Sequence, residues 1–235
     1  MSEESIKEFY DRKFRKEYGT DAVYLNTDPE HYHQKILERI KKGQVILDVG
    51  CATGYLGAVA KQKGNRVYGV EISEEAAKKA AELLDDVLVG NIEKVDLPFP
   101  EKYFDTIICS DVLEHLFDPK QGLIKLRKYL KPNGELMVVV PNVAHYSIRL
   151  MLLMGRWEYR NVGSMDYGHL RFFTKKSMVT LLESSNYNVK EIIPYIVLPP
   201  PLSFINKYSG KILTRLYRRF FNTTFAQSFL YVAEV

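Results

Sequence analysis

The chain has 235 residues and a net charge of +4, with 46% hydrophobic and 26% charged residues. This composition is ordinary for a globular domain, and so mild a charge gives no reason to expect a nucleic-acid partner. No apolar run approaches the roughly 20 residues that span a bilayer, and Ser2–Lys16 is too highly charged for a signal peptide. We interpret Cys51 and Cys109 as small buried hydrophobic residues, which fits a reducing compartment, so we expect a cytoplasmic protein. The length of the chain predicts one domain with a cap.

Residues 1–43 are predicted to be helical. Asp28 followed by Pro29 is typical of a helix start, and the next helix is expected over Glu30–Lys42, with Gly43 ending it. His31 and His33, near its start, are interpreted as surface or pocket-edge residues.

The most informative stretch is a short apolar run, Val45–Val49, followed by the glycine turn Gly50–Gly54 and a helix-prone segment, Tyr55–Lys63. A second apolar run, Arg66–Glu71, ends in an acid. Two strands around a helix, with glycines at the first turn and an acid after the second strand, indicate a nucleoside site in which the acid binds the ribose hydroxyls. Asp48 would repel a pyrophosphate but suits a cationic amino-acid group.

The remaining pattern alternates between strands and helices. The predicted elements are a helix over Glu75–Leu84 capped by Ser73, strands Val87–Val89 and Phe104–Ser110, a helix over Pro119–Leu130, a turn at Pro132–Gly134, a strand Glu135–Val140, a helix over Lys175–Ser185, and strands Tyr187–Tyr195 and Phe229–Val235. Short apolar strands separated by helices predict an α/β fold with a parallel sheet covered on both faces. Two long connections, 141–174 and 197–228, interrupt this alternation of strands and helices and are predicted to form a cap that contains the substrate site.

Four stretches resemble, in the same order, the motifs of class I S-adenosylmethionine-dependent methyltransferases. They are the glycine turn, Gly90–Ile92, Phe99–Ser110 and Leu130–Leu136. The resemblance covers about residues 44–140 and is closest to the branch of ubiquinone-biosynthesis O-methyltransferases and glycan-cluster enzymes. It implies a Rossmann-like, mostly parallel seven-stranded sheet over 44–235, with the cap insertions after strands five and six. Residues 1–43 would either lie over the cofactor pocket or pack against the sheet. Ala52 and Asn91 depart from the Gly and Asp that are common at their positions.

The resemblance also implies roles for individual residues toward S-adenosylmethionine. Asp48 and the turn would hold the methionine part, Glu71 the ribose, and Ile72, Asn91 and Ile92 the adenine, with the Asn91 amide oxygen accepting from the adenine amino group or its NH2 donating to a ring nitrogen. The full expected cofactor-binding set is Asp48, Gly50, Cys51, Ala52, Gly54, Glu71, Ile72, Asn91, Ile92 and Ser110.

Methyl transfer needs a general base only when the acceptor keeps a proton, and histidine suits that task near neutral pH. His115, His145 and His169 follow strands or lie in the cap and are the catalytic candidates. Each also has a structural interpretation: loop orientation for His115, a helix start for His145 and cap packing for His169. No metal is expected. The cluster of Asp111, Glu114 and His115 is a weak candidate for a metal site, because it resembles a cluster that is associated with a divalent metal in quinone O-methyltransferases.

We therefore expect a methyltransferase acting on an oxygen of a sugar, quinone or similar small molecule. The alternatives are a nucleic-acid or protein methyltransferase and a non-catalytic cofactor-binding subunit. Residues 203–221 predict a basic amphipathic helix, which would contact a membrane or lipid-linked acceptor peripherally, dock on the body of the protein, or contact a second subunit in a homodimer. Tyr146, Trp157, Tyr159 and Tyr167 would stack on a ring-shaped acceptor or fill the cap.

Overall fold

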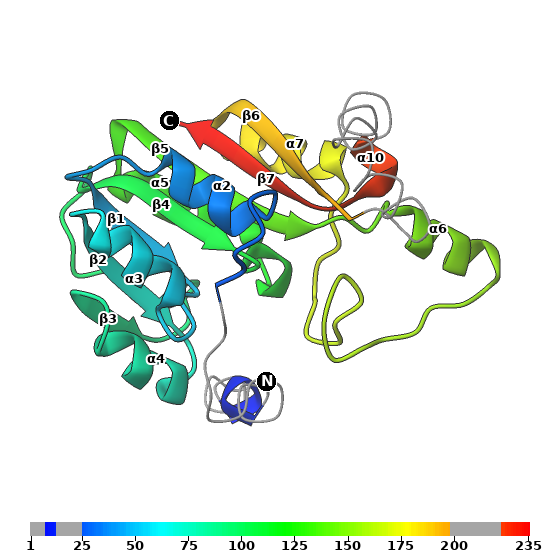
Figure 1. The fold of residues 1–235 in the computed structure, drawn as a ribbon, viewed down its shortest axis with the longest axis horizontal. Coiled ribbons are helices and arrows are strands. Elements are labelled where there is room, and N and C mark those ends of the chain that lie inside the picture. Colours follow the sequence, from blue (N-terminus) through cyan, green and yellow to red (C-terminus); the bar gives the residue numbers. More distant parts are fainter. Residues whose placement is uncertain (1–7, 13–24, 198–221) are drawn as a thin grey trace.

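The computed structural model describes residues 8–12, 25–197 and 222–235. These residues form one seven-stranded sheet with the order β3-β2-β1-β4-β5-β7-β6 (Figure 1). The strands are β1 (Val45–Val49), β2 (Arg66–Glu71), β3 (Asp86–Val89), β4 (Phe104–Ser110), β5 (Leu130–Pro141), β6 (Asn188–Ile196) and β7 (Ala226–Glu234).

The sheet is mostly parallel, as predicted. Strands β1 to β5 pair in parallel, whereas β7 pairs antiparallel with both β5 and β6. Parallel strands place their carboxyl ends at one edge of the sheet, which is where ligands bind in open α/β folds. The turns that follow β1 to β4 therefore meet at that edge.

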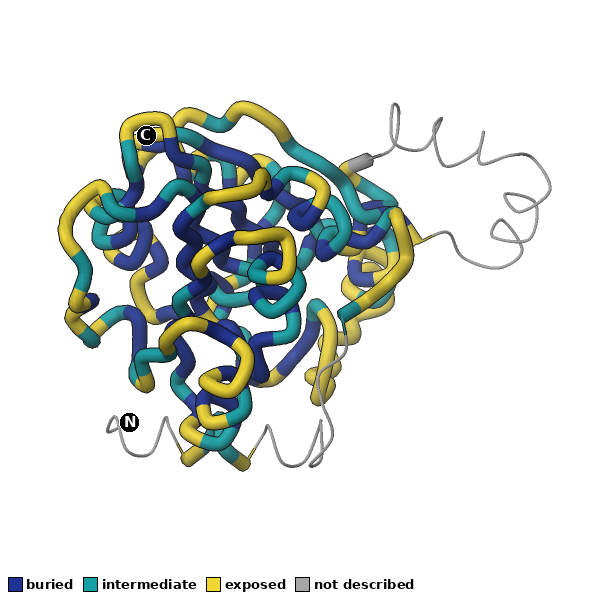
Figure 2. The backbone as a smooth tube through the Cα atoms, turned by 60° about the vertical axis from the view of Figure 1, so that its left-hand side comes forward, coloured by how far each residue is buried: buried dark blue, intermediate teal, exposed yellow. Residues whose placement is uncertain are grey.

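Helices cover both faces of the sheet, and the alternation of side chains along each strand explains why. In β1, Leu47 and Val49 belong to the core on the side of α5 (Pro119–Tyr129) and α7 (Lys175–Ser184). Ile46 points to the opposite core, on the side of α2 (Tyr32–Arg39), α3 (Tyr55–Gln62) and α4 (Glu74–Ala81). The central strand β1 is buried along its whole length and apolar apart from Asp48, because both of its faces are covered, and buried backbone gathers at the centre of the molecule (Figure 2).

Two local predictions were wrong. Helix α2 begins at Tyr32, not Glu30, because the His31 side chain accepts from the His33 backbone N–H and so caps the helix, while Asp28 forms a separate turn before it. The predicted turn at Pro132–Gly134 lies inside β5, where the pairing with β4 changes register between Phe104 and Thr106. Leu130 and Glu135 pair with Phe104 and Thr106, so the residues between them form a bulge within one continuous strand.

The first predicted cap insertion lies beyond the carboxyl end of β5 (Figure 1). It contains helix α6 (Tyr146–Leu153) and returns to the sheet at a bridge between Asn142 and Phe173. Most of the second insertion, including the predicted basic helix at 203–221, lies outside the described residues, which resume with the short helix α10 (Asn222–Phe225). Among the described helices, none has the length and apolar content to cross a bilayer.

Candidate active site

Two adjoining cavities lie at the carboxyl edge of the sheet. The first has a volume of about 380 Å³ and the second about 970 Å³. Four residues, Gly50, Ala52, Asp111 and His115, border both cavities. A ligand in the first cavity can therefore touch a ligand in the second at these residues, which we call the junction.

The first cavity begins at the glycine turn. Gly50, Ala52 and Gly54 have φ angles of 68°, 48° and 77°, and this left-handed conformation favours glycine. Ala52 therefore carries a strain of about 1–2 kcal/mol, which explains physically why glycine is common at its position. The backbone N–H groups of Gly50 and Cys51 donate to the Val70 carbonyl, so the turn is fixed against the end of β2.

Glu71, at the end of β2, is held by backbone donors. One carboxylate oxygen accepts from the Ala52 N–H at 2.9 Å and the other from the Ser73 N–H at 2.8 Å. Burial raises the pKa of Glu71, and these backbone hydrogen bonds oppose that shift by stabilising the charged form. The carboxylate borders the first cavity and keeps lone pairs with which it can accept from a pair of ribose hydroxyls.

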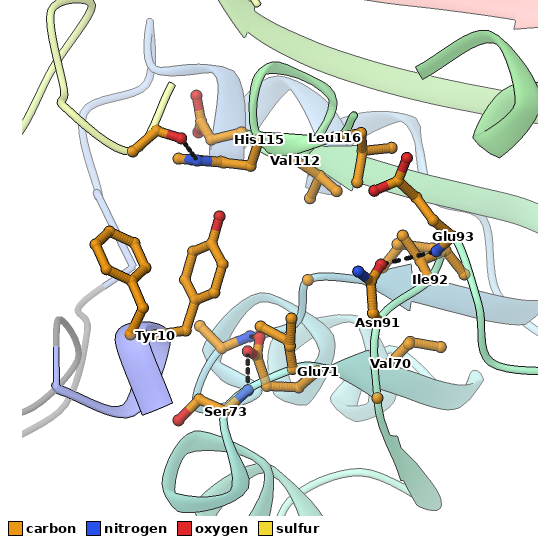
Figure 3. Close-up of a pocket in the computed structure, with 18 of the residues that line it drawn as sticks. Tyr10, Val70, Glu71, Ser73, Asn91, Ile92, Glu93, Val112, His115 and Leu116 are labelled. Carbon is orange, nitrogen blue, oxygen red and sulfur yellow. Dashed lines mark hydrogen bonds between the residues drawn. The ribbon is translucent and has the colours of Figure 1, made fainter. Parts of the chain in front are cut away.

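Asn91 and Ile92 follow β3 on the far side of the same cavity (Figure 3). The Asn91 side-chain oxygen accepts from the Glu93 backbone N–H at 2.9 Å. This bond turns the NH2 group toward the cavity, where it can donate to a ligand, and the role of Asn91 toward an adenine stays a prediction. Tyr10, from the described helical residues 8–12, lies across the cavity from Asn91 (Figure 3).

Three predicted cofactor residues lie behind the cavity surface. Asp48, Cys51 and Gly54 are buried and line neither cavity, whereas Gly50 and Ala52 line both. Burial, together with the nearby charge of Glu71, raises the pKa of Asp48 to about 7. Their direct contact with a cofactor stays a prediction: Asp48 lies within β1, and Cys51 and Gly54 are buried members of the turn itself.

Substituting Asp48 with asparagine should stabilise the cofactor-free protein only at high pH. A carboxyl whose pKa is raised on folding contributes stability below its unfolded pKa and loses it as pH rises through about 7. Asparagine does not titrate, so we expect a melting temperature about 5 °C above wild type at pH 8 and a much smaller difference at pH 5. The exposed Asp96→Asn is the control. An equal difference at both pH values would contradict the assignment.

The second cavity is walled by rings from the N-terminal side of the site. His31, Tyr32, His33, Tyr55 and Tyr195 border it, with ring centroids of 3.9 Å between His31 and Tyr32 and 5.3 Å between His33 and Tyr55. His31 and His33 are buried, so the surface interpretation was wrong, but both border this cavity, as the pocket-edge interpretation expected. Burial lowers the pKa of His31 to about 4 and that of His33 to about 3, and both rings are therefore neutral at pH 7. The recurrence of aromatic residues at 31–33 was the only sequence signal for this wall.

The three candidate catalytic histidines all border the second cavity, and hydrogen bonds distinguish them. His115 Nδ1 lies 3.0 Å from the Gly168 carbonyl, which can only accept, so its neutral ring carries the proton at Nδ1 and the lone pair at Nε2. His145 caps α6, and its Nδ1 accepts from the Ser147 N–H, which places the proton at Nε2. His169 Nε2 lies 4.0 Å from Glu114 Oε1. Of the three, only His115 reaches the junction.

The structure changes the candidate metal group. Ligand atoms of Glu114, His115 and His169 lie within 4.8 Å of one another, so His169 joins the group while Asp111 is outside it. Carboxylate and imidazole together suit a transition metal better than Mg²⁺. The sequence predicted no metal ion, and this prediction stays open.

Of the predicted cap aromatics, Tyr146 packs on Phe225 with ring centroids 5.1 Å apart. Trp157, Tyr159 and Tyr167 are instead more than a third exposed. Tyr167 borders the first cavity and none of these four borders the second. The structure therefore places none of them against the space expected for the acceptor.

The sheet has seven strands, and one of them, β7, is antiparallel and inserted between β5 and β6. A glycine turn follows β1 and an acid ends β2 at the carboxyl edge of this sheet. Together these features define the class I S-adenosylmethionine-dependent methyltransferases. The chain belongs to the methyltransferase domain family, whose model matches residues 22–192.

Curated relatives agree with this assignment. An uncharacterized methyltransferase of Geobacillus sp. (strain WCH70) is 32% identical over 133 residues, covering 55% of this chain and 58% of the relative. The mitochondrial ubiquinone biosynthesis O-methyltransferase of Schizosaccharomyces pombe is 29% identical over 160 residues, covering 64% of this chain and 57% of the relative. The chain thus spans little more than half the length of these two relatives.

The fold is shared with solved structures. The crystal structure of an S-adenosylmethionine-dependent methyltransferase from Archaeoglobus fulgidus superposes with a TM-score of 0.65 and covers 88% of this chain and 92% of that one, at 17% sequence identity. At that identity the likeness describes the fold alone. The family and the fold together imply S-adenosylmethionine as the cofactor.

Proposed function

We propose that the chain transfers the methyl group of S-adenosylmethionine to an oxygen of a small molecule. The observation that carries this proposal is the junction, where the cavity with nucleoside-type groups opens into a larger one. Glu71 and Asn91 would hold the nucleoside in the first cavity, and the acceptor would occupy the second. Methyl transfer from a sulfonium is an in-line displacement, so the main task of the protein is to align the two ligands at the junction.

The second cavity supports a small, ring-bearing acceptor. Its wall of neutral histidine and tyrosine rings suits an uncharged aromatic or sugar ring. A hydroxyl on such a ring keeps its proton at neutral pH, which is why a base at the junction is part of the proposal. The name of the S. pombe relative, a ubiquinone biosynthesis O-methyltransferase, also favours oxygen as the methylated atom.

The test has two stages. Calorimetry with S-adenosylhomocysteine should show binding to the full chain at a one-to-one ratio, and absence of binding would sink the proposal. Transfer of labelled methyl from S-adenosylmethionine is then measured with phenols, catechols, quinols and sugars, and with RNA, DNA and protein as competing acceptor classes. Methylation of a macromolecule with none of the small hydroxyl compounds would contradict the small-molecule assignment, and binding with no transfer to either class would favour a cofactor-binding subunit.

A further inference from the structure

Asp111 has a strained backbone at the junction. It directly follows β4, and its φ angle is 56°, in the left-handed region that residues other than glycine rarely adopt. Its backbone N–H donates to the Val139 carbonyl at 3.0 Å, so the strained residue is fixed to the neighbouring strand. Strain of this kind persists where the surrounding structure enforces it, and it concentrates at functional sites.

The carboxylate of Asp111 is oriented by two donors on one oxygen. The Tyr32 hydroxyl donates to Oδ2 at 2.9 Å and the Ser110 hydroxyl to the same atom at 3.3 Å. Among the described residues no donor reaches Oδ1. Because Asp111 borders both cavities, this second oxygen is the part of the carboxylate that a ligand at the junction can use.

Building on the proposed function, we propose that Asp111 is the catalytic base and that Tyr32 is its positioning residue. The acceptor hydroxyl donates to Oδ1 while its oxygen faces the methyl group. In the displacement the hydroxyl proton moves to Oδ1 and the oxygen forms a bond to the methyl carbon. The carbon–sulfur bond breaks with its electron pair going to sulfur. No oxidant, reductant or further reactant is needed.

The surroundings suit Asp111 to this task. Burial raises the pKa of Asp111 to about 6, and the hydrogen bonds from Tyr32 and Ser110 oppose the shift by stabilising the charged form. The other titratable groups at this end of the second cavity are Tyr55 and His33 on the N-terminal side and Glu114 and His115 on the 3-10 helix η1 (Leu113–His115). A base is most effective when its pKa lies near the working pH. Burial and the Asp111 charge raise the pKa of the Tyr32 phenol, so Tyr32 stays protonated and keeps its hydrogen for the bond.

His115 is the competing base, because it also borders both cavities. The decisive comparison is Asp111→Asn against His115→Asn, measured with the hydroxyl compound that wild type methylates fastest. Asparagine has nearly the shape of aspartate and tolerates a left-handed backbone. We expect D111N to bind S-adenosylhomocysteine within about threefold of wild type but to lose at least about 100-fold in kcat, and H115N to lose less than about tenfold. The reverse ranking would overturn the proposal.

A second measurement does not depend on turnover. The protein is labelled with ¹³C at the aspartate side-chain carboxyls, and its NMR spectrum is recorded without cofactor as a function of pH. The signal that is present in wild type and absent from D111N belongs to Asp111, and it should titrate near pH 6. Tyr32→Phe removes a donor to the charged form, so this pKa should rise by roughly one unit, while Tyr55→Phe, a tyrosine of the same cavity, leaves it in place. Titration near pH 4, or no response to Y32F, would overturn the proposal. Because this readout needs no acceptor, failure of the base assignment is distinguishable from failure of the proposed function.

Discussion

Replacing Glu71 with alanine is expected to weaken the binding of S-adenosylhomocysteine by roughly 300-fold or more. Two ribose hydroxyls donating to a carboxylate contribute about 1.5–3 kcal/mol each. The substitution has a second cost, because Glu71 also accepts from the Ala52 and Ser73 backbone N–H groups. Without the carboxylate, both donors lose their partner, and the glycine turn keeps only its backbone bonds to the Val70 carbonyl of β2.

Calorimetry on two Glu71 variants separates these contributions. Glu71→Gln keeps the shape and one acceptor oxygen, but its NH2 group cannot accept from either backbone donor, so its affinity should lie between those of wild type and E71A. The matched control is Glu82→Ala, which removes an exposed acid at the end of α4. Melting curves of each variant show whether the turn has also loosened. An E71A protein that binds within tenfold of wild type would contradict the ribose assignment.

The cofactor side of the site could be predicted because its signals are local in the sequence. The strand Val45–Val49, the turn with left-handed Gly50 and Gly54, and the acid Glu71 lie within 27 consecutive residues, and backbone geometry dictates each of them. The alternation of apolar strands and helices likewise predicted the mostly parallel sheet. Local rules sufficed because the central strand β1 is buried on both faces, and because α4, α5 and α7 each begin at a side chain that caps the helix.

The acceptor side could not be predicted in the same way because it depends on contacts between distant segments. Tyr32 meets Asp111 across 79 positions of sequence, and His169, within the cap insertion 141–174, approaches Glu114, which follows β4. Apart from the recurrence of aromatic residues at 31–33, nothing in the sequence distinguishes Tyr32 from the other tyrosines. The helix start at His31 was mislocated for a related reason: Asp28 is the better cap by type, but the helix begins where His31 is buried.

Gly50→Ala should be the most destabilising small substitution in the turn. A Cβ at this position would lie 2.6 Å from Val112 Cγ2, and φ is 68°, so the variant suffers both a clash and backbone strain. We expect a loss of about 3 kcal/mol in the free energy of unfolding, together with weak S-adenosylhomocysteine binding, because Gly50 borders both cavities. Gly43→Ala is the matched control, since Gly43 has a φ of 81° but nothing within 4 Å of its Cβ position. The free energy of unfolding of G43A should fall only by the cost of the backbone strain, about 1–2 kcal/mol.

Val112→Ala tests whether the clash is the larger part. This substitution removes the methyl group that the new Cβ would meet but leaves the left-handed backbone of residue 50 unchanged. In a double-mutant cycle, G50A/V112A should therefore be more stable than the sum of the single effects predicts, by about 1–2 kcal/mol, and should regain part of its binding. Strict additivity would mean that backbone strain alone explains the defect, and G50A would then resemble G43A in urea unfolding. The junction requires a glycine at position 50 for two reasons: the turn needs a left-handed residue, and Val112, which follows Asp111, occupies the space that a side chain would need.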